Sequence, residues 1–222
     1  MKINQMIFKN DVEAENQTKE KFKVKEITNS KKRVLFLGNS ITLHETAPNI
    51  GWHWNWGMAA SSAEKDYVHL VLKALHEKYG DISYCIANVG EWEKNYHKEG
   101  ILEKFKGAQA FKPDIVIFRF GENVNPESLK QYPFMDYLRN FVEYFTTTAK
   151  QIIITDTFWE HEYICDAMRQ VAEENGYTFV SIADLGYQDE NKALGLFEHA
   201  GVAAHPGDLG MQRIAEKIIM KL

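Results

Sequence analysis

The stretch RVLFLGNSIT, residues 33–42, decides the expected fold, because an apolar run is followed at once by a small polar turn. A short run that is apolar at nearly every position is typical of a strand buried on both faces of a parallel sheet, with helices covering both sides. Four further runs of this kind follow, at residues 82–87, 114–118, 151–155 and 178–182. The chain is therefore expected to build a parallel sheet.

Longer stretches with helical spacing lie between these runs. Ser61 and Glu64 form a capping-box pattern that predicts a helix from there to about Tyr79. Three more helices are expected, over residues 128–147, 161–175 and 207–222. This alternation predicts an α/β fold, a doubly wound, mainly parallel five-stranded sheet flanked by helices, with its ligand site beyond the carboxyl ends of the strands.

Length and composition favour a single domain. The chain has 222 residues, and its 26 Lys and Arg against 31 Asp and Glu give a net charge of −5. Residues 31–222 are expected to form the domain. Residues 1–30, which are rich in Lys, Glu and Asn, are expected to form an N-terminal arm or short edge strands.

Several partners are disfavoured by the sequence. It has no basic run of the kind that nucleic acid requires, and no apolar stretch approaches the ~20 residues of a membrane span. A signal-peptide core is not visible, since residues 6–8 are apolar but Lys9 follows at once, so a cytoplasmic location is expected. Cys85 and Cys165 are expected to be buried, reduced thiols.

Four chemically informative residues follow strands or precede the last helix. Ser40 follows the first run, Gly90 the second and Asn123 the third, while His205 stands just before the final helix. Since the carboxyl ends of parallel strands share one edge of the sheet, these residues are expected to converge.

In these residues the sequence resembles the SGNH hydrolases, the GDSL-type esterase and lipase superfamily, whose blocks supply Ser, Gly, Asn and His in this chain order. The resemblance covers roughly residues 32–222 and implies a flavodoxin-like three-layer sandwich, Ser40 as nucleophile and no cofactor. It also implies three oxyanion donors: the backbone N–H groups of Ser40 and Gly90 and the side-chain amide of Asn123. Asn39 stands where the family more often has Asp.

A serine hydroxyl is a poor nucleophile at neutral pH, so Ser40 needs a histidine to take its proton as it attacks an ester carbonyl. His205 is the residue that the resemblance assigns to this role. The family usually carries an Asp three residues before this histidine, but here that position is Val202. Either a backbone carbonyl or another carboxylate must orient the imidazole.

The carboxylates near His205 in sequence, or near the other predicted strand ends, are candidates for orienting it: Glu198, Asp208 and Glu122. If a side chain orients the imidazole, Glu198 is the expected carboxylate. Asp208 is better explained as an acid in the first turn of the last helix, where the helix dipole favours a negative charge.

The segment GWHWNWG, residues 51–57, holds three of the five tryptophans. It is interpreted as a wall of the substrate pocket or, alternatively, as a loop that buries its indoles against the domain or a second subunit. The residues assigned to the pocket are Asn39, Trp52, Trp54, Trp56, Trp92 and Trp159.

Metal and nucleotide sites are not predicted. His44, His53, His199 and His205 lack the spacing of a metal-ligand motif, and residues 38–40 lack the further glycines of a dinucleotide fingerprint and the Gly-Lys of a P-loop.

The sequence therefore predicts a serine esterase acting on short acyl esters of a polar alcohol, with an O-acetylated carbohydrate as the best candidate. Its partner would be a small-molecule or oligosaccharide ester, and homo-oligomerisation is left open. The alternative is a non-catalytic or weakly active carbohydrate-binding protein on the same fold.

Overall fold

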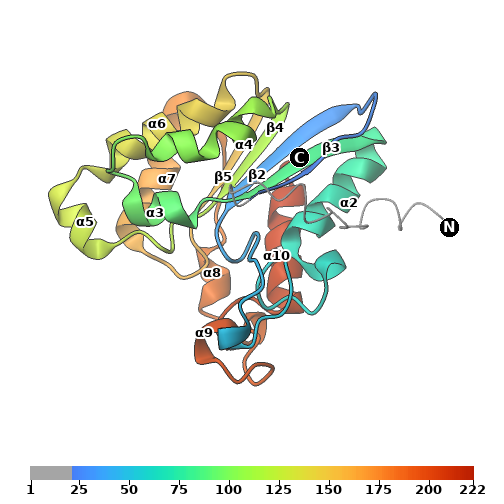
Figure 1. Ribbon diagram of the computed structural model, residues 1–222, viewed down its shortest axis with the longest axis vertical. Helices are drawn as coiled ribbons and strands as arrows, with labels where there is room; N and C mark the ends of the chain where they lie inside the picture. The colour runs from blue at the N-terminus through green and yellow to red at the C-terminus, as the bar shows by residue number, and fades with distance from the viewer. Residues whose placement is uncertain (1–21) are drawn as a thin grey trace.

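The computed structural model describes residues 22–222, which form a six-stranded sheet with helices on both faces (Figure 1). The strands are β1 (Phe22–Lys25), β2 (Lys32–Gly38), β3 (Ile82–Asn88), β4 (Ile115–Arg119), β5 (Gln151–Thr155) and β6 (Thr178–Val180). Their order across the sheet is β1-β3-β2-β4-β5-β6, and every neighbouring pair is parallel except β1 with β3. The predicted doubly wound, mainly parallel sheet is confirmed.

The sixth strand, β1, comes from the N-terminal segment. Phe22 and Val24 alternate with Lys23 and Lys25, and all four residues are half-buried, which is the pattern of a strand at a sheet edge. This strand lies within residues 1–30, where edge strands or an arm were expected. Residues 1–21 lie outside the described part of the chain.

The helices divide between the two faces of the sheet. In Figure 1, α3 (Gly90–Asn95), α4 (Lys106–Ala110), α6 (Phe134–Thr146) and α7 (Glu162–Asn175) lie on one side, whereas α2 (Tyr67–Tyr79) and α10 (Asp208–Ile219) lie on the other. Shorter elements connect them: η2 (Pro48–Ile50), η3 (Ala63–Lys65), η4 (Ile101–Phe105), α5 (Pro126–Gln131), α8 (Ala183–Gly186), η5 (Asp189–Asn191) and α9 (Ala200–Ala203).

Two predicted helices differ from those observed. The helix expected from Ser61 begins at Tyr67, because the Asp66 side chain caps it by accepting a hydrogen bond from the backbone N–H of His69. The helix expected over residues 128–147 is interrupted: α5 ends at Gln131 and α6 starts after Pro133. The residue before this proline is extended, with φ −127° and ψ 127°, as proline requires of its neighbour.

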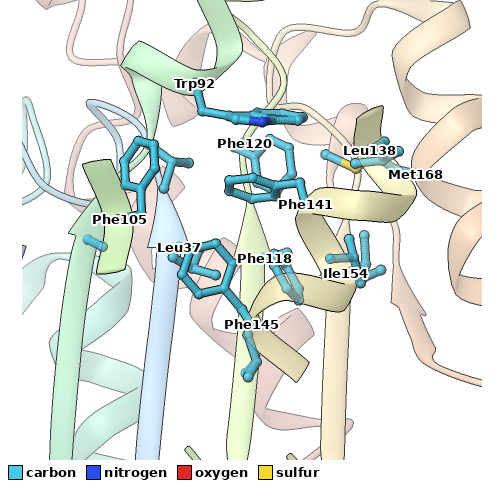
Figure 2. Packing of buried hydrophobic residues seen from close by; sticks show 14 of the residues in the cluster. Leu37, Trp92, Phe105, Phe118, Phe120, Leu138, Phe141, Phe145, Ile154 and Met168 are labelled. Carbon is cyan, nitrogen blue, oxygen red and sulfur yellow. The ribbon is translucent and has the colours of Figure 1, made fainter. Parts of the chain in front are cut away.

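An aromatic cluster fills the layer between the sheet and the helices α3, α6 and α7. Trp92 of α3 lies over Phe141 of α6 with ring centroids 4.0 Å apart, and Phe120 packs edge-on against both rings (Figure 2). Aromatic contacts of this kind contribute beyond their buried area. The cluster therefore fixes α3, whose first residue is Gly90, against the sheet.

Strand β2 lies at the point where the strand order reverses, with β3 on one side and β4 on the other. Open α/β sheets bind their ligands at this position, beyond the carboxyl end of the strand. Gly38 ends β2 where a Cβ would come within 1.8 Å of Thr42 Oγ1 and 2.6 Å of the Arg119 carbonyl oxygen, so only glycine lets the turn pack here. Within residues 22–222, no helix combines the length and apolarity that crossing a bilayer demands.

Candidate active site

Ser40 and His205 meet at the carboxyl end of β2, although 165 residues separate them in the chain. Ser40 follows β2 directly, and His205 lies between α9 and α10. The serine Oγ is 2.8 Å from His205 Nε2, a normal hydrogen-bond distance. A histidine in this position can take the hydroxyl proton while the oxygen attacks a carbonyl carbon.

A backbone carbonyl orients the imidazole of His205. Its Nδ1 lies 2.7 Å from the carbonyl oxygen of Gly201 in α9. Because this oxygen can only accept, Nδ1 carries the proton, and Nε2 is left to accept from Ser40. The backbone N–H of His205 bonds the Val202 oxygen instead, at 3.0 Å, so the tightened end of α9 leaves the Gly201 oxygen for the ring.

The surroundings keep His205 neutral. Burial is the main cause that lowers its pKa, to about 4, and the positive charge of Arg119 together with His44 lowers it further. The Gly201 carbonyl and the Glu122 carboxylate act in the opposite direction, but less strongly. The ring is thus already in the form that accepts a proton well below neutral pH.

The predicted oxyanion donors Gly90 and Asn123 lie next to this pair. A Cβ built on Gly90 would be 3.7 Å from Asn123 Nδ2, and both residues line one cavity with Ser40. One hydrogen of the Asn123 amide is held by Glu93 Oε2 at 2.7 Å, which leaves its other hydrogen to donate. The N–H of Gly90 already donates to Asn88 Oδ1 at 2.9 Å, so in this structure it does not point to the cavity as a spare donor.

Asn39 lies beneath the site rather than in a pocket wall, so its assignment to the pocket was wrong. It is buried, with Oδ1 accepting from Arg119 Nη2 at 3.0 Å and from the backbone N–H of Ile41 at 3.3 Å. Its Nδ2 donates to Glu93 Oε1 at 3.1 Å and to Glu122 Oε2 at 2.5 Å. An aspartate here would place a third carboxylate against two others, which explains the asparagine.

A cavity of about 430 Å³ opens over Ser40 and His205. Its apolar lining comes from Ile50, Met58 and Val202. Its remaining lining is mostly polar and includes His44, Asn88, Glu91, Lys94, Asn123 and His199. A cavity lined by both apolar and polar side chains suits a molecule that has both characters, and its volume falls within the ~300–1,000 Å³ of small-molecule sites.

None of the five tryptophans, all within the described residues 22–222, lines this cavity. The prediction that the 51–57 segment walls the pocket with indoles was wrong. The alternative of indoles buried against the domain fits Trp52 but not Trp54, whose side chain is 40% exposed. Trp52 is fully buried and packs edge-on against Trp54 and Trp56, while Phe197 lies 6.2 Å from it. These rings form a small core behind the apolar lining, and Trp54 is the most exposed of the three.

The two remaining tryptophans also act from outside the cavity. Trp92 belongs to the aromatic cluster under α3, as Figure 2 shows, so it was wrongly placed in the pocket. Trp159 packs edge-on against the His205 ring, with centroids 5.0 Å apart. Its contact is with the base, so it supports the imidazole that Gly201 orients.

Glu198 does not orient His205, because Nδ1 is occupied by the Gly201 carbonyl and the Glu198 side chain is exposed outside the cavity lining. Asp208 opens α10 and accepts from the backbone N–H and hydroxyl of Ser61, both at 2.8 Å, so the explanation as a first-turn acid holds. Glu122 pairs with Arg119.

Sequence reasoning missed Glu93 and Arg119. It did allow for a backbone carbonyl that orients His205, but it could not say that this carbonyl belongs to Gly201. Arg119 carried a usable signal, since a charged residue that ends an otherwise apolar strand must find a buried partner. Glu93 lies between Trp92 and a polar run, where nothing in the sequence marks it as buried. A backbone acceptor has no sequence signature at all.

The predicted absence of a metal site is untested. Among the described residues, no group of three or more His, Cys, Asp or Glu side chains is arranged to hold a metal ion.

Solved structures share this architecture. An acetylxylan esterase from Geobacillus stearothermophilus matches with a TM-score of 0.52 and 20% identity over 86% of this chain and 94% of that one. A GDSL-like protein from Bacteroides ovatus matches with a TM-score of 0.53 and 16% identity, over 86% and 98%. A two-domain esterase active on acetylated mannans matches with a TM-score of 0.51 and 16% identity, over 86% of this chain and 49% of that one.

No protein-family model and no curated protein matches the sequence. The described residues nevertheless have the fold of the GDSL-type, or SGNH, hydrolases, as the order of Ser40, Gly90, Asn123 and His205 predicted. Identities of 20% or less make this a statement about the fold.

Proposed function

We propose that the protein is a serine esterase that hydrolyses short-chain acyl esters, acetyl esters above all, of a polar alcohol such as a carbohydrate. The observation that carries the proposal is the Ser40 Oγ to His205 Nε2 contact of 2.8 Å, with Nδ1 of the same ring held 2.7 Å from the Gly201 oxygen. This chain of groups supplies a nucleophile, its base and an acceptor that orients the base.

The reaction proceeds in two halves. His205 Nε2 takes the proton of Ser40 as Oγ bonds to the ester carbonyl carbon, and the tetrahedral intermediate then expels the alkoxide, which receives that proton from His205. Water, deprotonated by the same nitrogen, attacks the acyl-enzyme and releases the acid and Ser40. The amide of Asn123 and the backbone N–H of Ser40 serve as oxyanion donors, and the N–H of Gly90 joins them only if it leaves its bond to Asn88 Oδ1. Losing one such donor typically costs ~10²–10³ in rate.

The missing carboxylate limits this base. In serine proteases its loss costs on the order of 10⁴ in kcat, mainly through the wrong imidazole tautomer. Here the Gly201 carbonyl sets the correct tautomer but brings no negative charge to stabilise the imidazolium. We therefore expect an active esterase with a low kcat.

The cavity supports a small acyl group on a polar alcohol. Ile50, Met58 and Val202 supply its apolar lining, while Asn88, Glu91 and Lys94 offer hydrogen-bonding groups to a hydroxylated leaving group. An acetylxylan esterase and an esterase active on acetylated mannans share the fold, which makes acetylated polysaccharide fragments the first substrates to try.

The test compares the wild type with Ser40→Ala on p-nitrophenyl acetate, butyrate and octanoate, and then measures acetate release from acetylated xylan and mannan oligosaccharides. Activity is expected on acetate, declining with acyl length and abolished in Ser40→Ala. Ser62→Ala serves as a matched control, since its hydroxyl caps no helix and lies outside the cavity lining. Equal background rates in all three proteins would reject the esterase and favour a carbohydrate-binding protein.

A further inference from the structure

Glu93 is a buried carboxylate that the proposed reaction leaves unused. It is 0% exposed and lies in α3, three residues after Gly90. Its Oε1 accepts from the backbone N–H of Gly121 at 2.5 Å, from that of Asn123 at 3.3 Å and from Asn39 Nδ2 at 3.1 Å, while Oε2 accepts from Asn123 Nδ2 at 2.7 Å. One carboxylate thus joins the three segments that carry the oxyanion donors.

The four contacts require an acceptor at both oxygens. Each partner is an N–H donor, so the geometry matches an ionised carboxylate, whereas a glutamine of the same shape would turn an NH₂ group toward at least one N–H donor. Burial, and secondly the negative charge of Glu122, raise the pKa of Glu93, and the bonds from Asn123, Gly121 and Asn39 oppose that rise. A buried charge is expensive unless its partners are well placed.

Gly121 and Asn39, which donate to this carboxylate, are themselves held in place by other contacts. The backbone of Gly121 has φ +128°, and a Cβ there would lie 2.7 Å from Thr157 Cγ2, so glycine is needed to bring its N–H to Glu93. Asn39, the neighbour of Ser40, is fixed by Arg119 through its Oδ1. The donors that Glu93 binds are therefore rigid, and they cannot easily move to other acceptors when Glu93 is substituted.

We infer that Glu93 is the positioning residue of the oxyanion hole: by accepting one hydrogen of the Asn123 amide, it holds the other on the side of Ser40. Without this acceptor the amide can turn over and present its oxygen to the developing negative charge, which would repel the transition state. The inference rests on the proposed esterase function. It assigns Glu93 no contact with the substrate.

A kinetic cycle tests the coupling. Glu93→Gln and Asn123→Ala are each expected to lower kcat on p-nitrophenyl acetate by ~10²-fold with KM unchanged, since both weaken a donor that acts in the transition state. The double variant is expected to be no slower than Asn123→Ala alone. Losses that multiply to ~10⁴-fold, or a loss that lies wholly in KM, would overturn the inference.

A matched control separates positioning from the effect of altering any buried carboxylate. Asp156→Asn changes a carboxylate of similar burial that accepts from the Ser181 hydroxyl and from the backbone N–H groups of Ile182 and Ala183, and from none of the oxyanion donors. Its kcat is expected to stay within a few-fold of the wild type. If Glu93→Gln fails to fold, Glu93→Asp keeps the charge with a shorter reach and enters the same cycle.

A second readout does not depend on esterase activity. In a ¹⁵N-labelled protein, the side-chain amide signal of Asn123, identified by its loss in Asn123→Ala, is expected to exchange slowly and to lie downfield because of its bond to a carboxylate. Glu93→Gln should move it to the range of a solvated amide, and an unchanged signal would overturn the inference. If the wild type hydrolyses no ester, the proposed function fails while this readout still decides the role of Glu93.

Discussion

The acid limb of the pH profile should lie far below that of an unperturbed histidine. Acylation needs neutral His205, whose pKa is lowered from 6.5 to about 4 chiefly by burial. At pH 5 the neutral fraction is about 90% for a pKa of about 4, but about 3% for a pKa of 6.5. The structure thus predicts about thirty times more acylation at this pH than an unperturbed base would allow.

The assay is kcat/KM for acetate release, measured from about pH 4 to pH 8, because this ratio reports the ionisation of the free enzyme. The folded pKa of His205 lies below its unfolded value, so protonation favours the unfolded state and the free energy of unfolding falls as the pH drops from 6.5 toward 4. Circular dichroism at each pH is therefore the control that separates loss of base from loss of fold.

As the pH is lowered, kcat/KM should fall to half its neutral-pH value only near pH 4. If it reaches half that value above about pH 6, in protein that circular dichroism shows to be folded, the low pKa of His205 is refuted. Such a result would mean that some group stabilises the imidazolium after all. A carboxylate beside the imidazole would raise the pKa of His205. The Gly201 carbonyl accepts the same hydrogen bond without a full negative charge, so the pKa stays low.

Three other changes have defined outcomes. Asn39→Asp replaces an amide donor by a third carboxylate between Glu93 and Glu122, so the pKa of the new carboxyl group should rise and the free energy of unfolding of the variant should fall as the pH rises. Urea unfolding should show a difference in this free energy between about pH 5 and pH 8 that is about 2 kcal/mol larger than in the wild type. Val202→Asp should lower the free energy of unfolding by about 2–4 kcal/mol and leave the acid limb in place, because the backbone already occupies the imidazole Nδ1; a gain in kcat would contradict this. Trp92→Ala should lower the free energy of unfolding by about 3–5 kcal/mol, against less than about 1 kcal/mol for the half-exposed Trp54→Ala, and equal losses would show that the two indoles are buried alike.

The sheet was predictable because its signals are local. Each central strand is an apolar run, and Gly38 and Gly90 mark turns that follow such runs. The edge strand β1 was less visible, since its alternating Phe22-Lys23-Val24-Lys25 pattern is short and lies in a charged segment. The break before α6 was readable from Pro133, whose effect on the preceding residue overrides a helical pattern.

The site was predictable only as far as side-chain identity reaches. The predicted pair Ser40 and His205 meets in space, whereas Glu198 and the tryptophans do not take the places expected of them. Whether an indole lines a cavity or fills a core depends on the helix or loop that packs against it, and a sequence motif does not carry that information. The roles assigned to Gly90 and Asn123 stay predictions, and the kinetic cycle with Glu93 tests that of Asn123.

The Gly201 carbonyl has a consequence for how this protein would be found and dissected. An orienting group that belongs to the main chain survives every side-chain substitution, so an alanine scan would report no orienting residue. A motif search that demands a carboxylate three residues before the histidine would pass over the chain. Replacing the peptide bond after Gly201 by an ester, which weakens that oxygen as an acceptor, is the substitution that reaches it.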